Sequence, residues 1–370
     1  MKITAITTHY IRIPYDMGAP TREFAGLRFP SQDHLLVQVD TDAGITGWGE
    51  GFGHNIIPST KAALETYVAP WFIGKDPTDI NALHREAAQA FHIFGRNGPV
   101  VYAHSGIDIG LWDIAGKRAG LPISDLLGGA RRKEVRAYAS LMRYGNPEVV
   151  RRICAERAAA GFKHIKLHEH TVEAVMAARE GAGPDVEIMN DVNCPWTVAQ
   201  AIEMEKAYRP ARLYWLEEPV FPPEDHTGLA RVRRAGQTRI AAGENAAGLH
   251  DFVDSFRKGA IDVAQPSVTK IGGITEMRKI IAAAEAHSVQ LIPHCAYFGP
   301  GNLASIHIVA SLSTDTLLEN IYANLEASPY GDAMFAKDGK VRVPQGPGLG
   351  VEPDMQIVAK YRQGQPITVK

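Results

Sequence analysis

The sequence has few of the features that mark secreted, membrane-bound or nucleic-acid-binding proteins. Its 370 residues include three cysteines, which are an odd and widely spaced set, Cys154, Cys194 and Cys295. Such a set favours a reducing compartment over a disulfide framework. No apolar run reaches the roughly 18 residues that span a bilayer, and the first residues lack the apolar core of a signal peptide. We therefore expect a cytoplasmic protein without a membrane partner.

Neither sign of charge is in excess. The 39 Lys and Arg residues nearly balance the 41 Asp and Glu residues, for a formal net charge of −2. This balance argues against a nucleic acid as partner. A chain of this length exceeds one compact core, which predicts one large domain and a smaller one.

What the sequence does contain is a repeated pattern in which a short β-compatible run ends near an acid. Asp191, Glu217 and Glu244 follow one another at spacings of 26 and 27 residues. A near-constant period of this size is typical of consecutive βα units in one parallel sheet. Acids at the same phase of such units meet at the C-terminal ends of adjacent strands, where barrel enzymes carry out their chemistry.

The period extends over most of the chain and predicts an α/β fold, a (β/α)7–8 TIM-like barrel over residues 126–343. Three of its strands end at the acids named above. The other strands are expected at 135–141, 162–168, 260–267, 289–294 and 316–319.

Residues 1–125 predict a smaller α+β capping domain. Two alternating runs, 34–40 and 45–50, are joined by a turn, and the segment 105–117 has helical periodicity with one apolar stripe. Residues 344–370 are expected to pack back on this cap and complete it. If the cap lies over the barrel mouth, two aperiodic loops, 15–32 and 51–58, line the substrate pocket; ordinary surface loops are the alternative.

Three carboxylates that converge would repel one another without a cation. Oxygen ligands alone suit a hard divalent ion, Mg²⁺ before Mn²⁺, and argue against zinc. An ion with open positions can bind a substrate carboxylate and stabilise the charge that develops on it. A single strand-end acid is more often a helix cap, but three in register favour a metal site. Glu218 could replace Glu217, because strand alternation directs only one of the two inward.

Three further residues could transfer protons. Lys166 and His168 project to the same side of the second strand, where each would be easier to deprotonate beside the other and beside a metal. His294 lies on the seventh strand, across the mouth. Two proton-transfer groups that face each other across a metal-bound carboxylate imply chemistry at the carbon α to that carboxylate. His164 and His170 have no such argument and are expected on loops or on the barrel exterior.

Motifs in the same order along the whole chain resemble those of the enolase superfamily, close to the mandelate racemase and muconate lactonizing enzyme group. They are Ile107–Lys117, Leu126–Gly129, Lys166-Leu-His168, Asp191-Val-Asn193, Trp215–Pro219, Gly243–Asn245, Lys270–Thr275, Pro293-His294, Glu319 and Pro347–Val351. Each motif alone is weak, but all of them in order at barrel spacing are specific.

The resemblance implies Mg²⁺-dependent removal of the proton α to a carboxylate through an enediolate, which is the mechanism described for this superfamily. It implies Asp191, Glu217 and Glu244 as metal ligands, with Asn193 and Glu319 around the substrate carboxylate. It also implies a small carboxylate as substrate, specificity set by the 15–32 and 51–58 loops, and a homo-oligomer, commonly a dimer or an octamer.

Two residues depart from the family pattern. His168 stands where the family commonly has the basic lysine, so Lys166 would tune it or exchange roles with it. Ser267 stands where the racemase group has an aspartate and the muconate group a lysine. Ser267 can bind substrate but cannot act as a permanent acid or base, and His294 loses the carboxylate that would hold its imidazolium. This asymmetry favours a sugar-acid dehydratase, in which His168 takes the proton and His294 assists departure of hydroxide. The alternatives are a racemase or epimerase, and a homologue that binds Mg²⁺ and a carboxylate without turnover.

Overall fold

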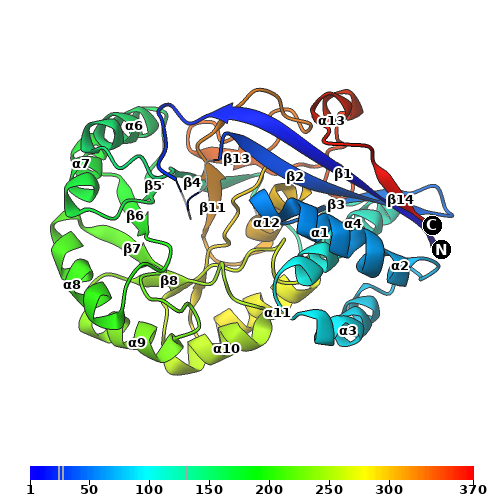
Figure 1. Cartoon of the computed structure of the whole chain (residues 1–370), viewed down its shortest axis with the longest axis horizontal. Coiled ribbons are helices and arrows are strands. Elements are labelled where there is room, and N and C mark those ends of the chain that lie inside the picture. Colours follow the sequence, from blue (N-terminus) through cyan, green and yellow to red (C-terminus); the bar gives the residue numbers. More distant parts are fainter. Residues whose placement is uncertain (24–25, 27–28, 131) are drawn as a thin grey trace.

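A computed structural model describes residues 1–370 except 24–25, 27–28 and 131. The chain forms a barrel with helices around its outer side, and beside it a cap built on an antiparallel sheet (Figure 1). Both termini lie at the end of the cap that is remote from the barrel. Among the described residues, no helix combines the length and apolar character needed to cross a membrane.

The barrel is a parallel sheet with the strand order β10-β9-β8-β7-β6-β5-β4-β11, which confirms the fold predicted from the period. Its strands are β4 (Glu134–Ser140), β5 (His164–Leu167), β6 (Glu187–Asp191), β7 (Leu213–Glu217), β8 (Ile240–Ala242), β9 (Val263–Ala264), β10 (Gln290–Leu291) and β11 (Leu317–Ile321). The two end strands are joined through a side chain, because the Thr316 hydroxyl donates to the Leu291 carbonyl at 2.6 Å. A short strand, β13 (Lys340–Arg342), pairs antiparallel with β4.

A helix follows each of the first seven barrel strands and covers the outside of the sheet. These helices are α6 (Pro147–Ala159), α7 (Val172–Ala182), α8 (Val198–Tyr208), α9 (His226–Ala235), α10 (Leu249–Lys258), α11 (Gly273–Ala286) and α12 (Pro300–Ser311).

Three strands are shorter than the sequence predicts. β9 ends before Pro266 and β10 before Pro293, and proline has no N–H with which to continue a ladder. β8 ends before Gly243, whose φ of 135° leaves the strand conformation. Ser267, His294 and Glu244 therefore lie on loops just beyond their strands, while Glu319 lies within its strand.

Large side chains fill the barrel interior beneath its C-terminal mouth. They form one buried cluster of Tyr138, Met189, Trp215, Ala241, Val263, Ile292 and Leu317. Six of these seven residues are supplied by a different barrel strand each, and Ile292 directly follows β10. The cluster gives the polar groups above it a rigid, water-free floor.

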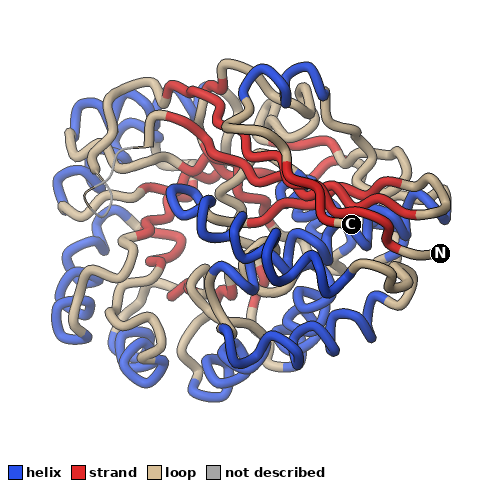
Figure 2. Tube along the Cα trace, turned by 45° about the vertical axis from the view of Figure 1, so that its right-hand side comes forward, coloured by secondary structure: helices blue, strands red, loops and turns tan. Residues whose placement is uncertain are grey.

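The cap sheet contains β1 (Ile3–Asp16), β2 (Ser31–Thr41), β3 (Thr46–Gly51), β12 (Asn324–Leu325) and β14 (Ile367–Val369). The predicted pairing of β2 with β3 is confirmed, and the C-terminal β14 pairs antiparallel with β1. Figure 2 shows the long strands of this sheet, with the two termini close together. The cap helices are α1 (Ile57–Ala63), α2 (Ala69–Phe72), α3 (Ile80–Phe91) and α4 (Pro99–Ala119). Two short helices complete the chain, α5 (Ile123–Leu126) and α13 (Met355–Tyr361).

Helix α4 is buried on two faces, whereas its sequence predicts one apolar stripe. The predicted stripe, with Ile107 and Leu111, packs in the cap core. The opposite face, with Trp112, packs against the barrel, and the Trp112 indole donates to the Thr275 hydroxyl at 2.9 Å. The helix also lies directly on β3, since a Cβ on Gly49 would stand 1.7 Å from the carbonyl oxygen of Gly106.

Buried carboxylates of the cap hold it to the barrel. Glu50 accepts the Gly301 amide at 3.0 Å at the start of α12, and Asp108 accepts the Thr275 amide at 3.0 Å at the start of α11. Neither barrel helix has a side-chain N-cap of its own. An acid at a helix N-terminus satisfies free amides and is favoured by the helix dipole. These bonds therefore fix the cap relative to the barrel mouth.

The buried histidine His104 in α4 should make the fold sensitive to acid. Burial, followed by the charge of neighbouring His84, lowers the pKa of His104 from 6.5 to about 3. The unfolded chain takes up this proton as the pH falls through 6.5, but the folded chain does not until about 3, so the free energy of unfolding falls with pH in between. His104→Phe should reduce this pH slope by about 1 kcal/mol per pH unit between pH 6.5 and about 4 in urea titrations. The same change at exposed His250 should leave the slope as it is, and an unaltered slope in His104→Phe would contradict the assignment.

Candidate active site

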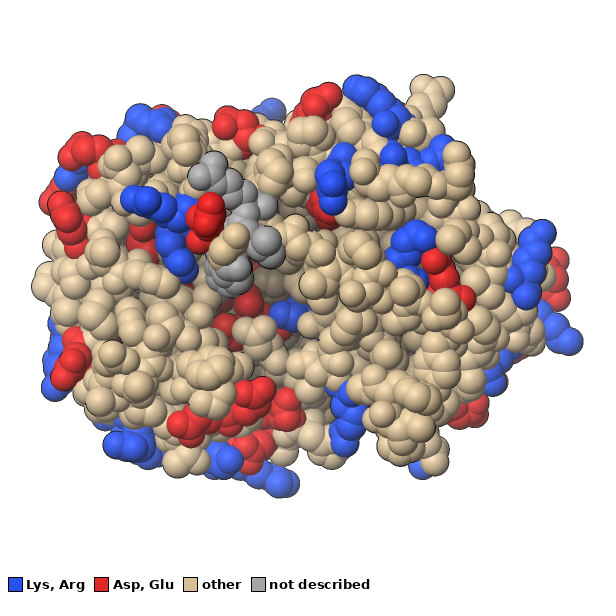
Figure 3. All heavy atoms as spheres, in the orientation of Figure 1, with Lys and Arg blue, Asp and Glu red and all other residues tan. Residues whose placement is uncertain are grey.

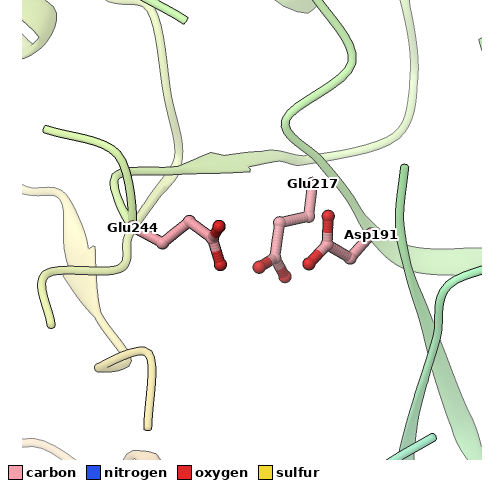
Figure 4. A group of neighbouring side chains, drawn as sticks. All are labelled: Asp191, Glu217 and Glu244. Carbon is pink, nitrogen blue, oxygen red and sulfur yellow. The ribbon is translucent and has the colours of Figure 1, made fainter. Parts of the chain in front are cut away.

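Three carboxylates lie together at the C-terminal mouth of the barrel. Asp191 ends β6 and is paired in register with Glu217, which ends β7, while Glu244 follows β8 by two residues. One oxygen of each lies within 4.8 Å of the others. Figure 4 shows the three side chains turned toward one another. The structure thus brings together the three acids that the period of the sequence places at one phase.

The geometry distinguishes Glu217 from Glu218. Glu217 points into the barrel, where the Trp215 indole donates to it at 2.9 Å. Glu218 has a left-handed φ of 47° and accepts from the Asn245 amide at 2.8 Å. Burial, followed by the charge of Glu244, raises the pKa of Glu218 to about 8. Glu217 is therefore the member of the cluster, and Glu218 lies behind it.

Lys166 of β5 occupies the centre of the acids. Its ammonium lies 3.0 Å from Glu217, 2.9 Å from Glu319 and 3.4 Å from Asp191, and its side chain is 1% exposed. Burial favours the neutral amine, but Glu217 and then Glu319 raise the pKa of Lys166 well above its ordinary value. These carboxylate neighbours favour the charged form of Lys166, whereas the sequence-based expectation of easy deprotonation depends on His168 and a bound metal beside it.

His168 approaches the cluster from the end of β5. Its Nε2 lies 3.2 Å from Asp191 Oδ2, and its Nδ1 donates to the carbonyl oxygen of Leu141. A carbonyl oxygen can only accept, so Nδ1 carries a proton and Nε2 is the nitrogen that can gain or lose one at the cluster.

His294 lies beyond β10, on the other side of the acids. It has a carboxylate neighbour after all, since its Nε2 is 3.0 Å from Glu244 Oε2. Its Nδ1 is buried with no hydrogen-bond partner among the described residues. Ser267 does not replace the missing aspartate, because its hydroxyl lies 3.3 Å from the hydroxyl of Tyr297.

Asn193 and Glu319 complete the set of residues expected at the site. The backbone amide of Asn193 donates to Asp191 at 3.0 Å. The side-chain Oδ1 of Asn193 is buried and has no hydrogen-bond partner within the described chain. Glu319 accepts the Cys295 amide at 2.7 Å and the Ser140 hydroxyl at 2.8 Å in addition to Lys166. Both residues therefore adjoin the acid cluster.

The residues of the cluster fit a hard divalent cation. Their donor atoms are carboxylate oxygens only, which is the preference of Mg²⁺. Burial and then the Asp191 charge raise the pKa of Glu217 well above its ordinary value, and a cation among the three acids would offset both effects. The unpaired Oδ1 of Asn193 adds an oxygen beside them.

The predicted 51–58 loop reaches the site. His54 is packed against Phe52, and burial, followed by the charge of His294, lowers the pKa of His54 to about 4. Phe52 in turn lies edge-on to Tyr297, with 6.5 Å between ring centroids. In the 15–32 loop, residues 24–25 and 27–28 are outside the described part of the chain. Figure 3 shows acidic and basic atoms at the base of a hollow between cap and barrel.

Sequence reasoning missed some contacts of the site. The role of Trp215 could have been inferred, because it lies two residues before Glu217 and so shares its face of β7. Asn245 belongs to the Gly243–Asn245 motif, but nothing in the sequence indicated its contacts. Its amide nevertheless binds Glu218, and its oxygen accepts from Lys270 at 3.3 Å.

Both parts of the chain match known families. Residues 6–128 match the mandelate racemase / muconate lactonizing enzyme N-terminal domain, and residues 148–357 match the enolase C-terminal domain-like family.

Known relatives of similar length are enzymes of sugar acids. The chain is 34% identical to D-galactarolactone cycloisomerase of Agrobacterium fabrum, over 99% of this chain and 100% of the relative. It is 33% identical to D-galactonate dehydratase of Ralstonia pickettii, over 99% and 96%.

A solved structure shares the fold over the whole chain. L-Talarate dehydratase from Polaromonas sp. JS666, complexed with Mg and L-glucarate, superposes with a TM-score of 0.84 at 27% identity, over 100% of this chain and 99% of that one. The alternative of a homologue without turnover finds no support among these relatives. From the cap sheet to the last barrel strand, the chain belongs to the mandelate racemase and muconate lactonizing enzyme group of the enolase superfamily, and it is an enzyme.

Proposed function

We propose that the enzyme removes the proton α to the carboxylate of a sugar acid and expels the β-hydroxyl as water. The observation that carries this proposal is the geometry of His168. Because the Leu141 carbonyl holds the proton of the neutral ring on Nδ1, Nε2 is free to act as the base, and it faces the acid cluster. The dehydratase names among the relatives support the same reaction class.

His294 supplies the second proton-transfer group. Its Nε2 faces Glu244 from the side opposite to His168, and its proton passes to the departing hydroxyl, which leaves as water. Dehydration needs one base and one acid, and these demands are unequal. The two histidines also differ in what holds them. A backbone carbonyl fixes the tautomer of His168, whereas Nδ1 of His294 has no hydrogen-bond partner among the described residues.

The remaining polar residues bind the substrate. Lys166, charged and held by Glu319, attracts the substrate carboxylate. The free Oδ1 of Asn193 can accept a proton from a substrate hydroxyl, and the hydroxyl of Ser267 can donate or accept.

Asp191, Glu217 and Glu244 would hold a Mg²⁺ ion. When bound, the ion would stabilise the negative charge that develops on the substrate carboxylate. The Mg in the L-talarate dehydratase structure supports this choice of metal.

A racemase or epimerase is the second candidate. It is favoured by one observation, the presence of histidines on opposite sides of the cluster, each with Nε2 toward an acid. Such an enzyme would return the proton to the other face of the carbon instead of expelling hydroxide.

Mg²⁺ should stabilise the folded protein, because it binds the native site and not the unfolded chain. At 100 times its dissociation constant the gain is about 2.7 kcal/mol, which thermal denaturation detects as a rise in Tm. Asp191→Asn should abolish the rise. Glu187→Gln, at the exposed start of the same strand, should keep it. A full Mg²⁺ response in Asp191→Asn would exclude the cluster as the metal site.

His168→Ala should lower the rate of α-proton exchange in D₂O by at least about 100-fold, since the general base is lost. The matched control is His170→Ala, because His170 lies two residues away and donates to the Val192 carbonyl at 3.0 Å. Proton NMR of the substrate measures the exchange. Exchange that persists in His168→Ala would make another residue the base.

The reaction itself can be identified by proton NMR of the Mg²⁺-loaded protein in D₂O with a panel of sugar acids. Loss of the α-proton signal together with a 2-keto-3-deoxy product is the expected result. Deuterium at the α carbon with a second diastereomer, and no keto product, would replace the dehydratase by the epimerase.

A further inference from the structure

Arg143 lies at the barrel mouth and uses only part of its guanidinium in the fold. It follows β4 by three residues and is half-buried, and its Nε donates to the carbonyl oxygen of His168 at 2.7 Å. Within residues 1–370, apart from 24–25, 27–28 and 131, no acceptor lies at hydrogen-bonding distance from either of its Nη atoms.

Arg179 shows how an arginine with a purely structural role is bound in this protein. Its Nε and both Nη atoms donate to backbone carbonyls of Ala211, Gly183, Val186 and Arg212. Arg143 is also partly buried, yet its two Nη groups are left over. An arginine fork of this kind is suited to a carboxylate, which it binds through two parallel hydrogen bonds.

The acids near Arg143 do not bind its fork. Glu169, whose charge favours the protonated form of Arg143, accepts instead the backbone amides of Tyr144 and Gly145 at 2.7 and 3.1 Å. The guanidinium of Arg22 reaches the same corner, where its Nη2 donates to the Gly145 carbonyl at 3.4 Å. The corner thus contains two arginines, lies against His168, which carries the proposed base, and has unused hydrogen-bond donors on Arg143.

We propose that Arg143 binds a second carboxylate at the far end of the substrate, so that the enzyme takes dianionic sugar acids, the aldarates, in preference to aldonates. This inference rests on the proposed function, in which the first carboxylate lies at the acid cluster. Because Arg143 is bonded to His168, an anion on its fork also fixes the distance between the far end of the substrate and the base.

Calorimetric titration of the Mg²⁺-loaded protein with matched pairs, glucarate against gluconate and galactarate against galactonate, tests the inference. For at least one pair the aldarate should bind about 10- to 100-fold more tightly, which is the range for hydrogen bonds to a charged group. Arg143→Gln should remove that preference and leave the affinity for the aldonate within about twofold. Arg143→Lys, which keeps the charge without the fork, should retain part of it.

Arg151→Gln is the control, because it removes one positive charge from α6, where Arg151 is paired with Glu148 at 2.6 Å and with Glu180 at 2.7 Å. It should keep the preference. Equal affinities for both members of every pair, or an equal loss for both in Arg143→Gln, would overturn the inference and leave Arg143 as a support for His168.

Exchange of the α-proton in D₂O, followed with the same acids, judges the proposed function separately. Exchange on aldonates without any aldarate preference would leave the function standing and remove the role of Arg143. Tight binding of aldarates that is lost in Arg143→Gln, without exchange, would remove the function and keep the anion site.

Discussion

The site depends on the burial of several carboxylates close to one another. Asp191, Glu217 and Glu319 surround the single ammonium of Lys166 in a space that water does not reach. Removing charges from water costs several kcal/mol for each ion unless a partner compensates. These acids lie at the barrel mouth, above a closely packed layer of large side chains. A site of this kind gains stability from a divalent cation and from a ligand that brings its charges to the right places.

Buried acids also join the cap to the barrel. Glu50 and Asp108 of the cap satisfy the first amides of barrel helices that have no side-chain caps of their own. Helix α4 contributes to this junction through Asp108 and through its second apolar face, which packs against the barrel. A substrate pocket between two parts of a chain keeps its shape only if their relative position is fixed.

The barrel, the order of its strands and the phase of its three acids could be predicted from sequence, because a 26-residue spacing and strand alternation are local properties. The actual ends of the strands could not be read from alternation alone, since Pro266 and Pro293 stop the ladders. The carboxylate neighbours of Lys166 could not be predicted from its own strand, because Glu217 and Glu319 come from strands far away in sequence. The sequence did not indicate a role for Arg143, since one arginine after a strand forms no pattern. Only the hydrogen-bond donors that it leaves unused in the structure distinguish it.

The two histidines at the mouth are placed alike but are not equivalent. His168 is oriented by a backbone carbonyl, an acceptor that no cation in the acid cluster would remove. His294 is oriented through Glu244, which is itself one of the three acids, so a cation at the cluster competes with His294 for that carboxylate. In the proposed elimination, one proton is taken from the substrate and one is given to the leaving hydroxyl. His168, with its fixed tautomer, suits the first step, and His294, which shares Glu244 with a cation, suits the second. They suit less well a reaction that must run through either histidine with equal ease. Ser267, in place of the racemase group's aspartate, thus supports the proposed elimination together with this geometry.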